Sequence, residues 1–103
     1  SASVYAFVHH RGVKAQYTIG EPIFPPVGTT GKYYPSEKKF VATLDVNCCS
    51  EIEVWKRGKT YIIEEGGDLC YCMKSVNVTI YNVEPGSTIV FVSYGKENTR
   101  WYA

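Results

Sequence analysis

The sequence predicts an all-β protein, a small antiparallel β-sandwich or barrel of seven to eight short strands stapled by two disulfides. Three observations lead to this prediction. Nine Tyr accompany many Val, Ile and Thr, while good helix formers such as Met, present once, are scarce, and such a composition suits a pleated surface. Apolar residues alternate with a period of two between frequent turn signals. All four cysteines fall in two short segments, NCCSE and LCYCM. A chain of 103 residues is expected to form a single domain, 1–103.

Each expected strand has its own justification in the pattern. The first alternates Val4, Ala6 and Val8 and ends in a hairpin turn over residues 9–12, where Gly12 can adopt a positive φ. Later strands are separated by turns at Gly58 and at 84–87. The expected strands lie at residues 3–10, 12–20, 39–47, 50–56, 60–65, 69–74, 76–83 and 88–95, and the polar segment 96–103 is expected to be a tail.

A proline-rich loop is expected at 21–39, because this segment holds four of the five prolines and proline cannot donate to a β-ladder. Structureless loops of this length are unusual in compact domains, so the segment either has a function or contains one short strand. Exposed apolar side chains on a stiff loop favour binding. The predicted contact residues are Ile23, Phe24, Tyr33 and Tyr34, followed by Trp101 and Tyr102 in the tail.

The four cysteines are expected to form disulfides. Their spacings, Cys-Cys and Cys-x-Cys, match neither the usual zinc knuckle nor the thioredoxin-like Cys-x-x-Cys motif. Neighbouring cysteines close strained rings, so the bridges should link the two segments. Antiparallel pairing keeps the sum of paired residue numbers nearly constant, which favours Cys48–Cys72 with Cys49–Cys70 over the crossed alternative. Disulfides in a small β chain predict a secreted, extracellular protein.

Composition points to binding more than to catalysis. The net charge of +1 lacks the basic excess typical of nucleic-acid binding, and no apolar run reaches the length of a membrane span. We see no signature of a cofactor or metal site. The expected function is recognition of another macromolecule, most directly a protein, as in pathogen effectors with a virulence role, toxins, inhibitors or ectodomain modules.

Two alternatives remain open at this stage. The His9-His10-Arg11 tip, with Glu64 or Glu65, supplies the residue types of a secreted ribonuclease-like toxin, although a polar hairpin turn explains the tip more simply. A cytosolic thiolate metal-binding protein would instead use the cysteines as ligands. Separately, Asn77-Val78-Thr79 is an acceptor motif for N-glycosylation, with Asn77 on the face opposite the apolar residues.

The run VNVTIYNVEPGSTIVFVSYG, residues 76–95, is similar to the region of fibronectin type III domains in which an apolar strand, a Pro-Gly turn and a second strand follow one another. The resemblance covers about a fifth of the chain. Ile89 stands where that family has a tyrosine, and no tryptophan occupies a recognisable early strand. This resemblance implies sandwich architecture, and we assign no family from it.

Overall fold

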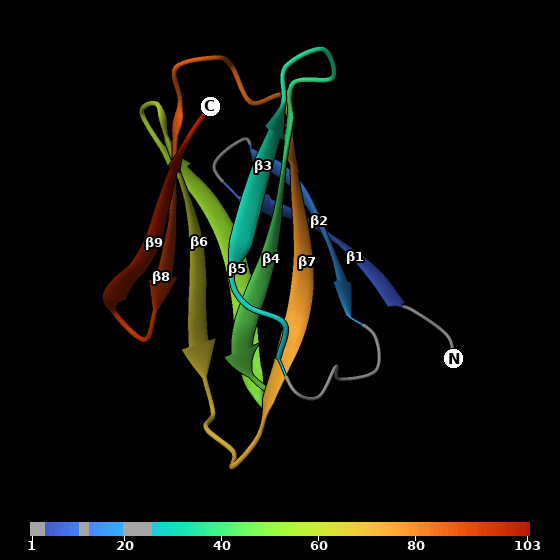
Figure 1. Cartoon of the computed structure of the whole chain (residues 1–103), viewed down its shortest axis with the longest axis vertical. Coiled ribbons are helices and arrows are strands. Elements are labelled where there is room, and N and C mark those ends of the chain that lie inside the picture. The colour runs from blue at the N-terminus through green and yellow to red at the C-terminus, as the bar shows by residue number, and fades with distance from the viewer. Residues whose placement is uncertain (1–3, 11–12, 20–25) are drawn as a thin grey trace.

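The structure, a computed structural model, describes the backbone of residues 4–10, 13–19 and 26–103 and the side chains of residues 26–103. The described part contains nine strands and no helix (Figure 1). The strands are β1 Val4–His10, β2 Val13–Ile19, β3 Thr30–Tyr34, β4 Lys39–Asn47, β5 Ser50–Arg57, β6 Thr60–Gly67, β7 Met73–Tyr81, β8 Thr88–Ser93 and β9 Lys96–Tyr102.

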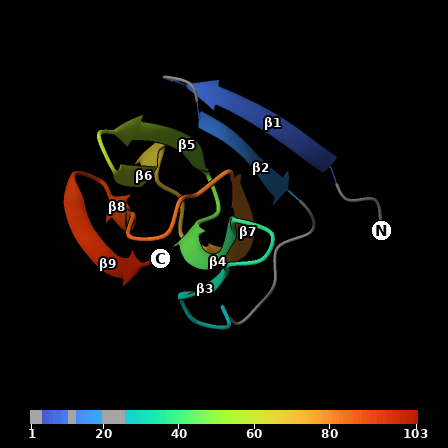
Figure 2. The same cartoon turned by 90° about the horizontal axis from the view of Figure 1, so that it is seen from above.

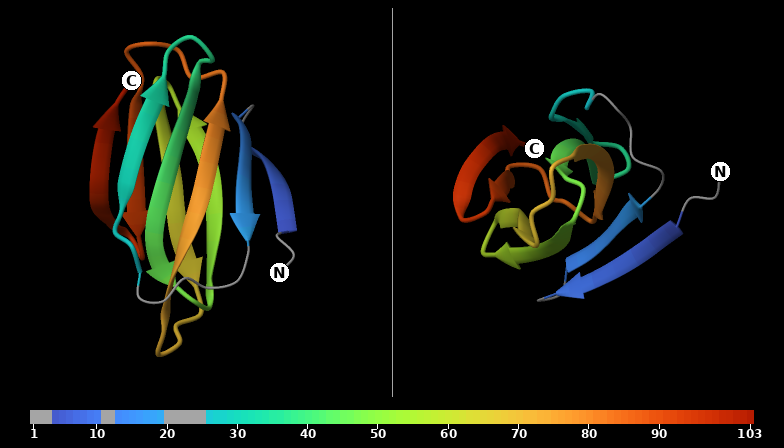
Figure 3. Two further views of the ribbon diagram at one scale, coloured as in Figure 1. Left: turned by 45° about the vertical axis from the view of Figure 1, so that its right-hand side comes forward. Right: turned by 90° about the horizontal axis from the view of Figure 1, so that it is seen from below.

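Two sheets pack face to face as a sandwich. The larger sheet has the order β1-β2-β7-β4-β3 and the smaller has the order β5-β6-β8-β9. All described pairings are antiparallel except that of β6 with β8, which is parallel. Seen along the strands, the β1–β2 hairpin carries the larger sheet past β7 to lie beside β5 (Figures 2 and 3). The larger sheet therefore curls around one side of the smaller one.

Alternation along the strands builds the core. In β4, Phe40, Ala42, Leu44 and Val46 are buried, while the residues between them lie on the outer face and are only half-buried. The same period of two operates in β5, β6 and β7, so that each sheet turns one apolar face inward. The other core side chains are Ile52, Val54, Tyr61, Ile63, Val76, Val78, Ile80, Val83, Ile89 and Phe91.

The edge strands β3 and β9 close the sandwich on the side away from β1. Trp101 of β9 packs on Phe40, with ring centroids 5.3 Å apart. Both rings lie against Gly31 of β3, where a Cβ atom would approach Phe40 Cζ to 2.5 Å. Glycine is thus required here by close packing. The Tyr33 hydroxyl donates a hydrogen bond to the Val83 carbonyl over 2.6 Å, which fixes β3 to the segment after β7.

The all-β class, the two-sheet sandwich and the two disulfides are confirmed. Individual elements differ from the prediction. The proline-rich segment 21–39 contains the short strand β3, and the polar tail forms β9, an edge strand whose outer face is exposed to solvent. Residues 69–72, expected in a strand, form a loop. His9 and His10 end β1 and pair with Lys14 and Val13, rather than forming a turn.

Candidate binding site at the disulfide-linked tip

One end of the sandwich carries a short loop with an apolar surface. This tip loop, residues 68–72, connects β6 to β7 and extends beyond the neighbouring strand ends (Figure 1). Leu69 is 70% exposed, Tyr71 is fully exposed, and Met73, the first residue of β7, is 41% exposed. Single exposed apolar side chains are common on protein surfaces, but three at alternate positions, two in the tip loop and one at the start of β7, form a candidate contact surface.

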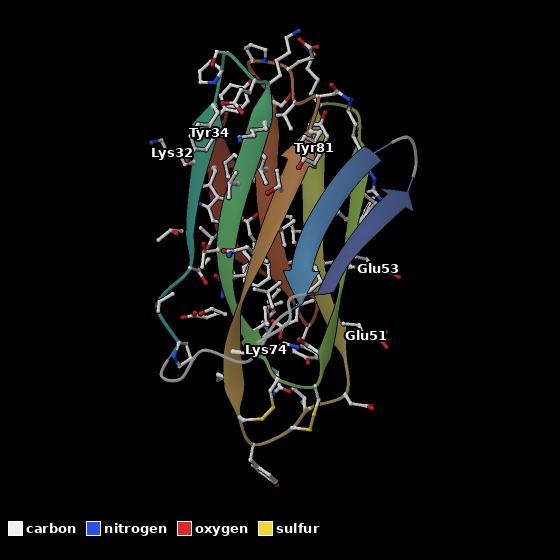
Figure 4. All side chains as sticks on the ribbon, turned by 90° about the vertical axis from the view of Figure 1, so that its right-hand side faces the viewer. Lys32, Tyr34, Glu51, Glu53, Lys74 and Tyr81 are labelled. Carbon is white, nitrogen blue, oxygen red and sulfur yellow. A yellow bond between two sulfur atoms is a disulfide. The ribbon has the colours of Figure 1, made fainter. Side chains whose placement is uncertain are left out.

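Two disulfides hold the tip loop to the turn between β4 and β5. Cys48 is bonded to Cys72 and Cys49 to Cys70, with Cα atoms 5.5 and 5.6 Å apart. Both bonds are visible at the lower end of the molecule in Figure 4. The nested pairing predicted from the antiparallel spacing is confirmed. The first bond to form closes a loop of 24 or 21 residues, worth about 3 kcal/mol in the chain-entropy model, and the second adds less because its loop is then already short.

Asn47, the last residue of β4, fixes the backbone of the tip loop by hydrogen bonds. Its Oδ1 accepts from the amide nitrogens of Cys49 at 3.0 Å and Cys70 at 2.9 Å, and its Nδ2 donates to the Cys70 carbonyl over 2.7 Å. The side chain is nearly buried, with 8% of its surface exposed. The side-chain amide of Asn47 is thus hydrogen-bonded to two strand connections that lie over twenty residues apart in sequence.

Beneath Asn47 lies a buried acid. Glu65 faces the interior from β6 and is 3% exposed. Its Oε2 accepts a hydrogen bond from the Asn47 amide over 2.7 Å, and its Oε1 accepts one from the Ser93 hydroxyl over 2.8 Å. A buried carboxyl group is tolerated only when it is hydrogen-bonded in this way. The resulting chain of bonds connects β8, β6 and β4 to the tip loop, and it makes this end of the sandwich rigid.

Beside the tip loop, the outer face of the smaller sheet carries a groove of about 340 Å³. Glu53 of β5 lies directly across from Glu64 of β6, a like-charge pair that costs stability. Glu51 and Glu53 point away from β5 into solvent (Figure 4). The groove is lined by Glu51, Glu53, Glu64, Glu65, Gly66, Gly67, Tyr94 and Gly95.

Tyr94 joins the groove to the tip loop. With Gly95 it forms the two-residue turn between β8 and β9, and both residues have positive φ, 48° and 82°, as a type I′ hairpin requires. Such a φ is uncommon for a bulky residue. The Tyr94 hydroxyl donates to the Asp68 carbonyl over 3.1 Å. Burial of the ring and the nearby Glu65 carboxylate raise the pKa of Tyr94.

The structure separates the residues predicted for binding. Ile23 and Phe24 lie outside the described residues. Tyr33 and Trp101 turn inward and pack against the core, so they contribute to stability. Tyr34 lies on the outer face of the larger sheet, with the ammonium groups of Lys32 and Lys39 near 5 Å from its ring centre (Figure 4), and Tyr102 is exposed on β9. The described residues of the set do not form one surface.

Sequence reasoning missed the tip-loop residues because LCYCMK alternates like a strand. The signal that could have identified them is the disulfides themselves. When Cys70 and Cys72 both face a cross-linked partner, Leu69, Tyr71 and Met73 must point the other way, toward solvent. Alternating apolar residues next to a pair of disulfides therefore indicate exposed side chains as readily as buried ones.

The described residues bear on one of the two alternative functions, the thiolate metal site. All four sulfur atoms are in disulfides, so none is available as a thiolate ligand of a metal ion. Arg11 of the proposed catalytic tip lies outside the described residues, and the side chains of His9 and His10 are not among those described. The structure has no helix, among its described residues, that is long and apolar enough to cross a membrane.

Comparison with known proteins adds no assignment: no family model matches the chain, and no curated protein or solved structure matches it significantly.

Proposed function

We propose that the protein is a secreted, disulfide-stabilised binding module that recognises another macromolecule, most directly a protein, through the tip loop. One observation carries the proposal. Three exposed apolar side chains, Leu69 and Tyr71 of the tip loop and Met73 at the start of β7, alternate along a segment that two disulfides and the Asn47 side chain hold in place. The proposed role is non-enzymatic, because this surface offers contact area rather than reacting groups.

Rigidity makes such a loop effective in binding. Association normally loses free energy through the ordering of flexible loops and side chains, and a loop that is already fixed avoids most of that loss. Tyrosine brings a large contact area with only two torsions to order, and aromatic anchors dominate many interfaces. The cross-links therefore support recognition as well as stability.

The charges beside the tip loop suggest what the partner offers. Glu51, Glu53 and Glu64 lie around the neighbouring groove, and Asp68 begins the tip loop itself. We infer a partner with an apolar pocket for Tyr71 and cationic side chains near it. Complementary charge acts mainly on the rate of association, so binding should slow as salt concentration rises.

The same cross-links support the proposed compartment. Two disulfides are consistent with an oxidising environment, since cytosolic thiols are kept reduced. Secretion is the simplest route by which a chain of this size reaches such an environment. A role as effector, toxin, inhibitor or ectodomain module is compatible with this placement, and the partner's identity would decide among them.

The test compares two double variants. The Leu69→Ala/Tyr71→Ala variant changes the tip, and the Tyr34→Ala/Tyr102→Ala variant changes the half-buried Tyr34 and the exposed Tyr102 elsewhere. A partner captured by cross-linking from extracellular material should lose at least tenfold in affinity for the first variant, a loss of about 1.4 kcal/mol. It should bind the second variant as tightly as the wild type.

Thermal unfolding provides the folding control, because side chains on the outer faces contribute less to stability than core side chains and both variants should remain folded. Undiminished binding by the tip variant, with loss of binding by the Tyr34→Ala/Tyr102→Ala variant, would move the binding site to the predicted aromatic residues.

A further inference from the structure

The acceptor motif Asn77-Val78-Thr79 is the one Asn-x-Ser/Thr sequence in the chain. It lies in β7, which pairs with β2 on one side and β4 on the other. Val78 is fully buried in the core, so Asn77 and Thr79 are directed to the opposite, outer face of the larger sheet. Asn77 is exposed there. The fold thus presents the two recognised side chains on one open surface.

The local hydrogen bonding orients the Asn77 amide. The Thr43 hydroxyl of β4 donates to Asn77 Oδ1 over 2.8 Å. Asn77 Nδ2, the atom to which a glycan is attached, donates to no side chain among those that the structure describes. The described residues next to Asn77 along β7 and directly across from it on β4 are short, namely Ser75, Thr79 and Thr43. On the side of β4, an attached sugar would therefore leave the sheet next to short side chains among the described residues.

We propose that Asn77 is a site of N-linked glycosylation, with a lipid-linked oligosaccharide as the donor. In the transfer, Asn77 Nδ2 forms a C–N bond to the anomeric carbon of the first sugar. The C–O bond from that carbon to the lipid diphosphate breaks, and the lipid diphosphate leaves with the electron pair. The amide proton passes to a base of the host transferase. The acceptor on this chain is Asn77, and Thr79 supplies the hydroxyl of the recognised motif.

The position in a central strand is compatible with this chemistry because of the order of events. β7 pairs with β2, about sixty residues earlier in the chain, so the strand is completed only by long-range contacts. The transferase meets the unpaired, extended segment. The folded structure then decides only whether the glycan can be accommodated. A buried asparagine such as Asn47 could not carry one, whereas Asn77 can.

A glycan at this position would cover the outer face of the larger sheet. Apart from the polar residues near Asn77, that face carries the apolar or aromatic side chains of Val41, Tyr34 and Tyr81. A hydrophilic cover would limit association between copies of the chain through this face. Asn77 lies four residues along β7 from Met73, about 13 Å at the usual rise per residue, so the tip loop would remain open.

The test is secretion of the full chain, preceded by a signal peptide, from cultured eukaryotic cells. We expect the secreted protein to exceed its sequence mass by one oligosaccharide. Peptide N-glycosidase should remove the excess and leave aspartate in place of the modified asparagine. Asn77→Gln and Thr79→Ala should abolish the excess mass. Thr79→Ser, which preserves an acceptor motif, and Asn98→Gln, which changes an exposed asparagine outside any motif, should retain it.

Secreted, disulfide-bonded wild-type protein at its unmodified mass would overturn the proposal, as would an oligosaccharide that persists in Asn77→Gln. If Asn77→Gln fails to be secreted, Thr79→Ala gives the same decision, because it keeps Asn77 and its bond with Thr43. Partner binding through the tip loop is independent of this result and should be unchanged after enzymatic removal of the glycan.

Discussion

Replacing Asn47 with alanine would remove one side chain that holds both connections at the tip end. The Asn47→Ala variant keeps the backbone amide that donates to Glu65 and keeps both disulfides. It loses the acceptor of the Cys49 and Cys70 amides and the donor to the Cys70 carbonyl. Three hydrogen bonds thus disappear together, and no other bond in this network is changed directly.

The expected loss can be worked from those three bonds. A net contribution of about 1 kcal/mol for each gives roughly 3 kcal/mol of unfolding free energy. The backbone atoms concerned are only partly buried, so water can replace some of the lost bonds and the penalty for unsatisfied groups stays small. For a domain of this size, a loss of about 3 kcal/mol lowers the melting midpoint by roughly 10–20 °C.

The assay is urea unfolding under non-reducing conditions, together with amide hydrogen exchange. Exchange at Cys49 and Cys70 should accelerate in the variant, since these amides lose their acceptor. Asn47→Asp retains an acceptor for both amides and loses the donor, so its stability should fall between those of Asn47→Ala and the wild type.

Asn98→Ala is the matched control, because Asn98 is exposed and bonds only to the adjacent Thr99 hydroxyl among the described residues. Its effect should remain within about 0.5 kcal/mol. If Asn47→Ala were no more destabilising than this control, the inference that Asn47 orders the tip loop would be refuted.

Two further predictions concern the edge and the groove. Gly31→Ala should lower the free energy of unfolding in urea by about 1–3 kcal/mol, because the new Cβ would approach Phe40 and Trp101 to 2.5 and 2.8 Å. Gly66→Ala, where a Cβ meets no atom within 4 Å, should lower it far less. Equal losses in the two variants would contradict the close packing at Gly31. The raised pKa of Tyr94 means that its hydroxyl ionises more readily in the unfolded chain, so its contribution to stability is complete below the ordinary tyrosine pKa near 10 and is lost as pH rises through the higher folded value. Stability measured from pH 8 to 11 should therefore fall less steeply in Tyr94→Phe than in the wild type, and parallel curves would count against this coupling.

The features that could be predicted from sequence are those set by local pattern. The alternation of buried and half-buried residues in β4 and the turn at Gly58 depend on neighbouring residues alone. The nested disulfides follow from antiparallel pairing of the two cysteine-containing segments. Local pattern does not identify the strand β3, because Thr30–Tyr34 is short, contains Gly31, and follows three prolines. Its glycine is required by Trp101, seventy residues away, and no local pattern contains that information.

The strand β9 and the tip loop were misassigned for opposite reasons. β9 lies at an edge with a solvated outer face, so only Trp101 and Thr99 turn inward and the segment looks like a polar tail. The tip loop has the alternation of a strand, yet its apolar residues face solvent. In both segments, the position in the fold determines whether an apolar or polar residue is buried or exposed.

The parallel pairing of β6 with β8, the one such pairing among the described strands, has a consequence for how fast the protein folds. The smaller sheet consists of two local hairpins, β5–β6 and β8–β9, and each can form from adjacent residues. When the two hairpins pair through β6 and β8, Thr60 lies beside Thr88. The chain that connects the two hairpins must first cross to the other sheet as β7. Such a topology has high contact order, so docking of preformed hairpins should limit the folding rate and place it among the slow all-β folders, in milliseconds to seconds.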